Sequence, residues 1–256
     1  NCPETSELNR FTVRWWDKAD WSYGMQNSRF GGVWFAWPTT NTDTNKPSEF
    51  HIRGSQIGYL YFGPLSTSAH SGPMVIADMS INIVGTTIQG RGPPDFPVLS
   101  VEQSGTIQDI PSYNEFVDLA AVQAFGVTFR NCRIIFEDCV LGDASGGVHP
   151  MAFLLRNSTL TNTTITIKGA SSLSAAETSG RRSILAAPIS LSNVVLEQGS
   201  AIIIDSANVS ASRTSRALLL SNVAASQTSR IEVVDCRISV DESSYTASSI
   251  NPFVAV

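Results

Sequence analysis

Four segments of the chain repeat one pattern of apolar and polar positions, in which apolar residues lead through a polar residue into Asn and then return to apolar residues. Asn tolerates the left-handed backbone of a turn, and its amide can hydrogen-bond to the Asn of a neighbouring repeat. The pattern therefore predicts short strands that turn at Asn and stack, with these asparagines aligned down one edge. The four residues are Asn131, Asn157, Asn193 and Asn222.

The intervals between these asparagines are unequal, at 26, 36 and 29 residues (131 to 157, 157 to 193 and 193 to 222). The polar stretches 171–183 and 206–216 have no apolar period and are expected to be loops. Other short segments are rich in β-branched residues, which are typical of strands on a half-buried surface. The segments predicted as strands are 164–167, 201–205, 231–234 and 237–240.

Short strands joined by loops of unequal length favour an all-β fold of the right-handed parallel β-helix type. Such a solenoid brings like residues together after connections of different length. An antiparallel β-sandwich is the alternative, since its short strands also recur every ~8–12 residues. Residues 79–89 alternate well enough to form a first level. We therefore expect the solenoid over 79–256, continuing or docking at its C-terminal end.

The first part of the chain, residues 1–78, differs from the rest and is expected to be an aromatic-rich N-terminal cap or extension. All five tryptophans lie there, and several prolines predict sparse regular structure before residue 79. The aromatic side chains either cover one end of the solenoid or stack against sugar rings. The candidate ligand-binding residues are Trp15, Trp16, Trp21 and Trp34.

One helix is predicted after Ser112, because Ser112 and Glu115 have the spacing of a capping box and apolar residues follow. The alternative is that pairing with other segments makes residues 120–127 a strand.

Composition indicates a folded chain with a polar surface. Hydrophobic residues make up 42% of the 256 residues and charged residues only 15%, so there is enough apolar surface for a sizeable core. Ser, Thr and Asn supply much of the polarity, which favours an extracellular or cell-surface location. The net charge of −5 argues against binding to nucleic acid. No apolar run approaches the ~20 residues of a membrane span, so no direct membrane span is expected in this chain.

The four cysteines are even in number and lack the close spacing of a zinc site, so neither a metal nor another cofactor is expected. Two interpretations stay open: disulfides, which would fit an oxidising compartment, and buried free thiols that pack as small apolar residues. The candidate disulfide residues are Cys2, Cys132, Cys139 and Cys236.

Three asparagines stand in glycosylation sequons: Asn157, Asn162 and Asn208. Asn157 also belongs to the repeated pattern, and an Asn stacked in a ladder cannot carry a glycan. Asn162 and Asn208 are therefore the favoured glycan acceptors.

Catalytic motifs are weak. The histidines are not spaced as metal ligands, and no Gly-x-Ser-x-Gly turn occurs. Adjacent Glu137 and Asp138 would point to opposite faces of a strand. A polysaccharide-cleaving lyase or glycosidase would therefore need a second acid from Asp118, Asp205 or Asp235.

The segments 131–140, 189–209 and 218–240 resemble the dispersed gene family of large surface glycoproteins from trypanosomatid parasites. The resemblance implies a parallel β-helix ectodomain that is exposed on a cell or secreted and acts in adhesion. This chain is much shorter than those proteins and lacks their membrane-spanning tail, and no site residues carry over.

The expected function is that of a non-enzymatic extracellular or cell-surface β-solenoid glycoprotein, which mediates adhesion or assembly by binding a glycan or a surface protein. The alternatives are the polysaccharide-cleaving enzyme and a structural subunit of a surface filament, formed by self-assembly or within a larger parent polypeptide.

Overall fold

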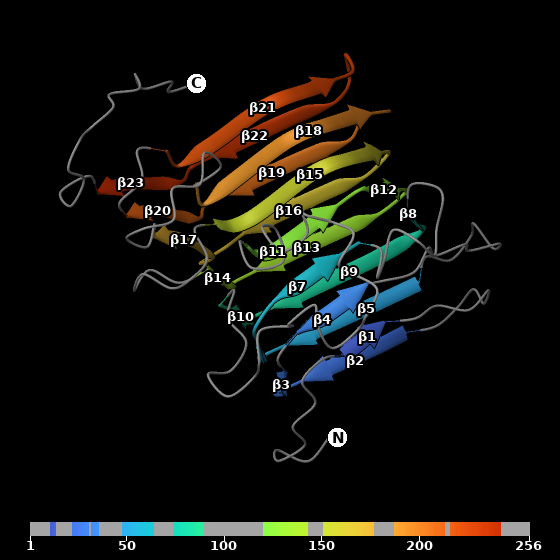
Figure 1. Cartoon of the computed structure of the whole chain (residues 1–256). Helices are drawn as coiled ribbons and strands as arrows, with labels where there is room; N and C mark the ends of the chain where they lie inside the picture. Colours follow the sequence, from blue (N-terminus) through green and yellow to red (C-terminus); the bar gives the residue numbers. More distant parts are fainter. Residues whose placement is uncertain are drawn as a thin grey trace, which may run out of the picture.

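The computed structural model describes residues 11–13, 22–30, 32–35, 48–63, 74–89, 120–142, 151–176, 187–212 and 216–241. Within these ranges the secondary structure is entirely β, in 23 strands that form three parallel sheets (Figure 1). We name them sheets A, B and C in the order in which the chain first enters them.

Sheet A has nine strands, and sheets B and C have seven each. Sheet A contains β1 (Phe11–Val13), β4 (Val33–Phe35), β7 (Leu60–Phe62), β8 (Met74–Ala77), β11 (Ala120–Phe125), β12 (Val127–Arg130), β15 (Met151–Thr161), β18 (Ile189–Glu197) and β21 (Leu218–Ala225). Sheet B contains β2 (Ser22–Gln26), β5 (Ser48–Arg53), β9 (Met79–Val84), β13 (Arg133–Glu137), β16 (Thr164–Lys168), β19 (Ala201–Asp205) and β22 (Arg230–Val234). Sheet C contains β3 (Arg29–Phe30), β6 (Gln56–Ile57), β10 (Thr87–Ile88), β14 (Val140–Gly142), β17 (Ser172–Ala176), β20 (Asn208–Ser212) and β23 (Arg237–Asp241).

The chain visits the sheets in the fixed order A, B, C, and each set of strands from one such pass is called a tier. β11 and β12 both pair with the long strand β15, so they occupy one level of sheet A. Seven tiers follow one another from β1–β3 to the last tier, β21–β23. Within each sheet, residues at equivalent positions of successive tiers lie side by side and form columns.

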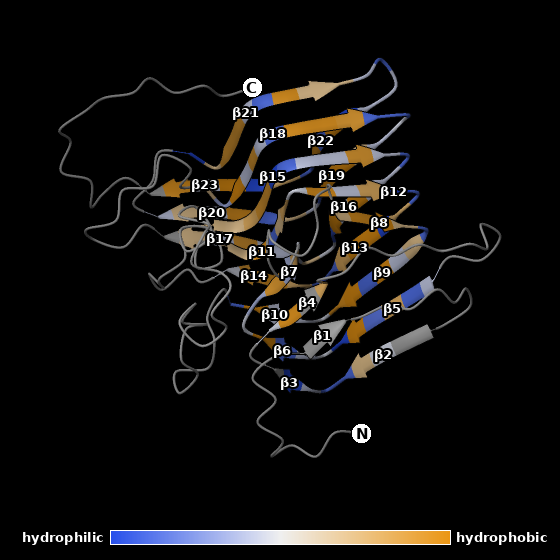
Figure 2. Ribbon diagram, turned by 45° about the vertical axis from the view of Figure 1, so that its right-hand side comes forward, coloured by the Kyte–Doolittle hydropathy of each residue, from blue (hydrophilic) through white to orange (hydrophobic). Residues whose placement is uncertain are grey.

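One column of sheet B, which we call the central column, shows how the core is built. Every second residue of a strand points to the same face, so inward residues of paired strands stack. Figure 2 shows apolar residues recurring along the strands of successive tiers. In register, the central column contains Met25, Ile52, Ile83, Phe136, Ile167, Ile204 and Val233.

Residues with left-handed backbone turn the chain at the ends of strands. Between sheets B and C this conformation is taken by Asn27, Gly54, Gly85, Asp138, Gly169, Ser206 and Asp235, with φ between 49° and 71°. Glycine adopts it without strain, and Asn and Asp are the side chains that tolerate it best. The turns therefore follow from the residues placed at them.

The repeated asparagines form two ladders, so the prediction of one aligned set of four is wrong. In the first ladder, between sheets A and B, Asn131 Nδ2 donates to Asp78 Oδ1 and Asn162 Nδ2 donates to Asn131 Oδ1, each at 2.9 Å. In the second, within sheet A, Asn193 Nδ2 donates to Asn157 Oδ1 at 2.9 Å. Asn222 Nδ2 then donates to Asn193 Oδ1 at 2.8 Å. One sequence pattern thus marks two different bends.

The predicted right-handed parallel β-helix is wrong, because the parallel sheets form a curled half-barrel and not a β-helix solenoid. The antiparallel sandwich is also wrong, since every pairing among the described strands is parallel. The prediction took the four repeated asparagines as one aligned edge of a solenoid. In the structure the pattern marks two kinds of bend, one between sheets A and B and one within sheet A.

Three local predictions have clear outcomes. The stretches 171–183 and 206–216 were expected to be loops, but they contain strands β17 and β20, so this prediction is wrong. Regular structure was expected to be sparse before residue 79, yet strands β1–β8 lie there and belong to the same three sheets. Residues 120–125 form strand β11, which is the alternative to the predicted helix, and residues 112–119 lie outside the described residues.

Candidate docking surface at the last tier

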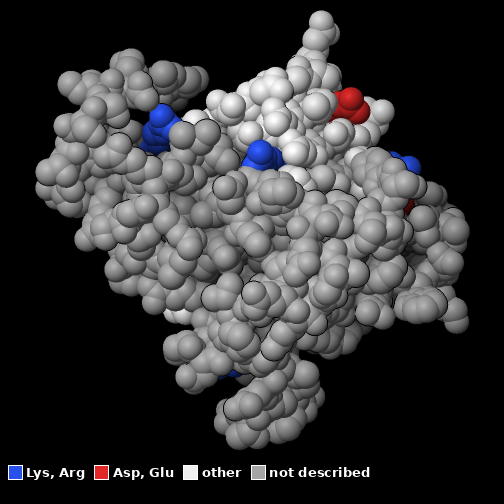
Figure 3. Space-filling view, in the orientation of Figure 1, with Lys and Arg blue, Asp and Glu red and all other residues white. Residues whose placement is uncertain are grey.

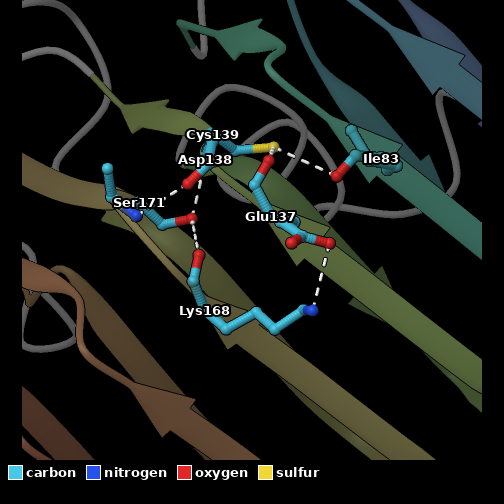
Figure 4. Close-up of polar contacts among 7 residues, drawn as sticks. Ile83, Glu137, Asp138, Cys139, Lys168 and Ser171 are labelled. Atoms are coloured by element: carbon cyan, nitrogen blue, oxygen red, sulfur yellow. Dashed lines mark hydrogen bonds and ion pairs between the residues drawn. The ribbon is translucent and has the colours of Figure 1, made fainter.

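The predicted catalytic acids take part in structural contacts (Figure 4). Glu137 lies on the outer face of sheet B, 40% exposed, with Oε2 3.1 Å from Lys168 Nζ. Asp138 has left-handed backbone, and its Oδ1 accepts a hydrogen bond of 2.8 Å from the Ala170 backbone N–H. The structure therefore places one acid in an exposed ion pair and the other at a turn. Asp118 lies outside the described residues, and Asp205 accepts a hydrogen bond from the neighbouring Ser206 hydroxyl.

The predicted disulfides are wrong for the described cysteines, because Cys132, Cys139 and Cys236 are all free thiols. Each Sγ lies 3.2–3.3 Å from two backbone carbonyl oxygens, one of them two residues back along the chain. Burial raises the pKa of Cys132 to about 12 and that of Cys139 to about 11. Both buried thiols are therefore protonated at neutral pH. Cys2 lies outside the described residues.

The structure separates the three sequon asparagines. Asn157 and Asn162 both lie in ladders, and a glycan on Asn162 Nδ2 would disturb its hydrogen bond to Asn131. Asn208 stands exposed at the start of β20, outside both ladders. Glycosylation stays a prediction at all three.

Most of the predicted aromatic ligand site lies outside the described residues. Trp15, Trp16 and Trp21 are among the residues not described, and only the backbone of Trp34 is described, in β4. Glycan binding by these residues stays a prediction. Among the described ranges, no group of three or more His, Cys, Asp or Glu side chains could hold a metal ion. None of the described segments is a helix long and apolar enough to cross a membrane.

At the last of the described tiers, residues of the inward columns are exposed. Leu220, Val233 and Ile238 continue inward columns of sheets A, B and C and are 41%, 41% and 54% exposed. The residues directly beneath them, Leu191, Ile204 and Val209, are 0%, 0% and 2% exposed. We call the surface formed by Leu220, Val233 and Ile238 the open end. Sequence reasoning singled out this end of the chain but not these residues.

The backbone is also incompletely paired at the open end. β21, β22 and β23 each pair with one described strand, namely β18, β19 and β20. Each therefore leaves one edge without a strand partner among the described residues. Backbone N–H and C=O groups along such an edge form a template for another strand.

The central column is covered at its opposite end. Met25 begins the central column in β2 and is 5% exposed, whereas Val233 ends it at 41%. The five residues between them are all fully buried. Exposed core is therefore a property of one end of this column.

Charges at the last tier nearly balance. From the start of β21 to the end of β23 there are two positive and three negative side chains, whereas the whole chain has a net charge of −5. In Figure 3, the described surface at the top, where β21 and β22 lie in Figure 1, is mostly uncharged. The five side chains are Arg230, Glu232, Asp235, Arg237 and Asp241.

No family model matches the chain, and neither a curated protein nor a solved structure is significantly similar to it. The resemblance to trypanosomatid surface glycoproteins therefore stays a prediction.

Proposed function

We propose that this protein is a non-enzymatic adhesion or assembly protein that acts by docking a polypeptide onto its open end. The observation that carries the proposal is the exposure of Leu220, Val233 and Ile238, each stacked on a residue that is at most 2% exposed. Exposed core of this kind is unfavourable in a free protein and is typical of a binding surface.

The chemistry of the open end favours a polypeptide over a small molecule or a sugar. A ligand that satisfies the three strand edges must supply backbone hydrogen-bonding groups. To cover the three inward columns, it must also supply apolar side chains at alternate positions. An added β-strand supplies both at once, with main-chain hydrogen bonds for affinity and alternate side chains for specificity. Hydroxyl groups of a glycan would leave the apolar columns uncovered.

Nothing in the described structure favours the enzymatic alternative. Glu137 is paired with Lys168, and Asp138 accepts a backbone hydrogen bond at a turn. The extracellular or cell-surface location stays a prediction, because no structural observation supports it.

Binding of a strand peptide tests the proposal. A fluorescently labelled peptide with the sequence of residues 199–212 contains β19 and β20, whose inward side chains already pack beneath the open end. Because each tier repeats the one before it, this peptide should add to β22 and β23 of the full chain. Fluorescence anisotropy at low protein concentration should show saturable binding that a scrambled peptide does not reproduce.

Two matched variants locate the binding. Val233→Lys places a charge in the central column and should weaken peptide binding at least about 30-fold, the loss typical of a central interface residue. Val195→Lys makes the same change at a residue that is 37% exposed on the side of sheet A, and it should bind the peptide as the parent does. An absence of binding to the parent, or equal losses in the two variants, would overturn the proposal.

A further inference from the structure

We infer that the polypeptide that docks on the open end is a second copy of this chain, attached open end to open end as a closed two-fold dimer. The inference rests on the proposed function and adds the identity and orientation of the partner.

The two ends of the central column differ in exposure, since Met25 is 5% exposed and Val233 is 41% exposed. A head-to-tail contact would have to bring the open end of one copy against the first tier of the next, where Met25 is already covered. A contact between two open ends instead covers Val233 in both copies. Two identical apolar surfaces that cover each other define an isologous interface, which closes at two subunits.

The edges of β21, β22 and β23 can pair with the same edges of a second copy. A two-fold axis across the open end reverses the direction of one copy, so edge strands of the two copies would meet antiparallel. Antiparallel pairing is at least as stable as parallel pairing and satisfies the N–H and C=O groups left at β21–β23. The inward columns of both copies would then join into one continuous core.

Two copies of a surface with a large net charge would repel each other, but strands β21–β23 of the last tier and the residues between them carry only two positive and three negative side chains. The net charge of these strands and the residues between them is −1, whereas the chain as a whole carries −5. A partner with the same balance of charges therefore fits this end with little net repulsion.

Sedimentation equilibrium of the full chain over a wide concentration range tests the inference. A monomer of 27.5 kDa should pass into a species of about 55 kDa (2 × 27.5 kDa) and no larger. Val233→Lys should raise the dimer dissociation constant at least about 30-fold, and Leu220→Lys should do the same at sheet A. Val195→Lys, exposed on the side of the molecule, should leave the dissociation constant unchanged. Circular dichroism should confirm that each variant is folded.

The outcomes separate this inference from the proposed function. Species that keep growing with concentration would overturn the closed dimer, and so would a dimer that Val195→Lys weakens as much as Val233→Lys does. A monomer at every concentration that still binds the strand peptide would overturn the second copy and leave docking of another polypeptide. A monomer whose β22 and β23 amides are protected from hydrogen exchange would show that its own chain covers the open end, and would overturn both.

Discussion

Small polar residues next to the left-handed turns connect successive tiers through the edge of the core. The Cys132 backbone N–H donates to Thr163 Oγ1, and the Thr163 N–H donates to Ser200 Oγ, each at 3.1 Å. Thr163 Oγ1 also donates to a carbonyl two residues back, Thr161 O, as the Cys132 thiol does to Arg130 O. The thiol therefore occupies a hydroxyl position of a ladder. Its burial follows from this position and requires no reactive role.

This burial makes stability sensitive to alkaline pH. Burial raises the pKa of Cys132 from 9.0 to about 12, so between these values the unfolded chain loses a proton that the folded chain retains. The unfolded state then binds fewer protons, and the free energy of unfolding falls as pH rises. Cys132→Ser should retain the ladder and remove up to about 1.4 kcal/mol per pH unit from this slope. Urea denaturation at pH 8 to 10.5 measures how the free energy of unfolding of the parent and of the variant changes with pH.

A Thr163→Ser variant is the control for that experiment, since it changes the neighbouring ladder position without changing a titrating group. The prediction fails if the parent and Cys132→Ser lose stability equally between pH 8 and 10.5.

At the scale of the element, each strand ends or bends where a residue accepts positive φ. Asn193 bends β18 at φ 52° and takes part in two ladder hydrogen bonds, one to Asn157 and one from Asn222. Gly126 makes the corresponding bend between β11 and β12 without a side chain. The bend therefore requires only the left-handed backbone conformation, while the Asn amide adds hydrogen bonds between neighbouring strands.

Substitution of Asn193 separates these two contributions. Asn193→Gly removes the ladder hydrogen bonds and should cost about 1–3 kcal/mol of the free energy of unfolding. Asn193→Ala also forces a Cβ into left-handed backbone and should cost roughly 1–2 kcal/mol more. Chemical denaturation of both variants measures the difference. Equal stabilities of the two variants would show that the bend does not require a left-handed residue.

The sequence predicted individual strands better than their arrangement. The segments 164–167, 201–205, 231–234 and 237–240 are confirmed as strands, because alternation of β-branched residues is a local signal. The two ladders could not be distinguished, since the same Asn pattern serves a bend within sheet A and a turn between sheets A and B. Gly54 and Gly85 make equivalent turns elsewhere with no amide to mark them.

The site was harder to predict for a related reason. Leu220, Val233 and Ile238 have the same inward alternation as buried residues one tier earlier. Only the position of their tier at the end of the sheets makes them exposed. Sequence patterns identify residues that face a core, but they do not indicate where that core ends.

At the scale of the whole molecule, one core runs along the tiers, and its central column is covered at Met25 and exposed at Val233. Stability should therefore be graded along the stack. Ile204→Ala removes a fully buried side chain in the sixth tier and should cost about 2–5 kcal/mol. Ile238→Ala makes the same change in the seventh tier, where the side chain is 54% exposed, and should cost less than about 1.5 kcal/mol. Urea denaturation of dilute protein measures the two losses of free energy of unfolding. Equal losses in the two variants would contradict the gradient.

The order of the tiers along the chain also bears on synthesis. Paired residues of sheet B are separated by between 27 positions, from Ser22 to Glu49, and 53 positions, from Ser80 to Arg133. After the first tier, every described strand except β8 pairs with one from the preceding pass. Most newly emerged segments therefore meet a template that left the ribosome shortly before. The nascent polypeptide can therefore fold from the amino end onward. At each stage the unpaired backbone groups and exposed core residues are those of the tier formed last, until the next tier covers them.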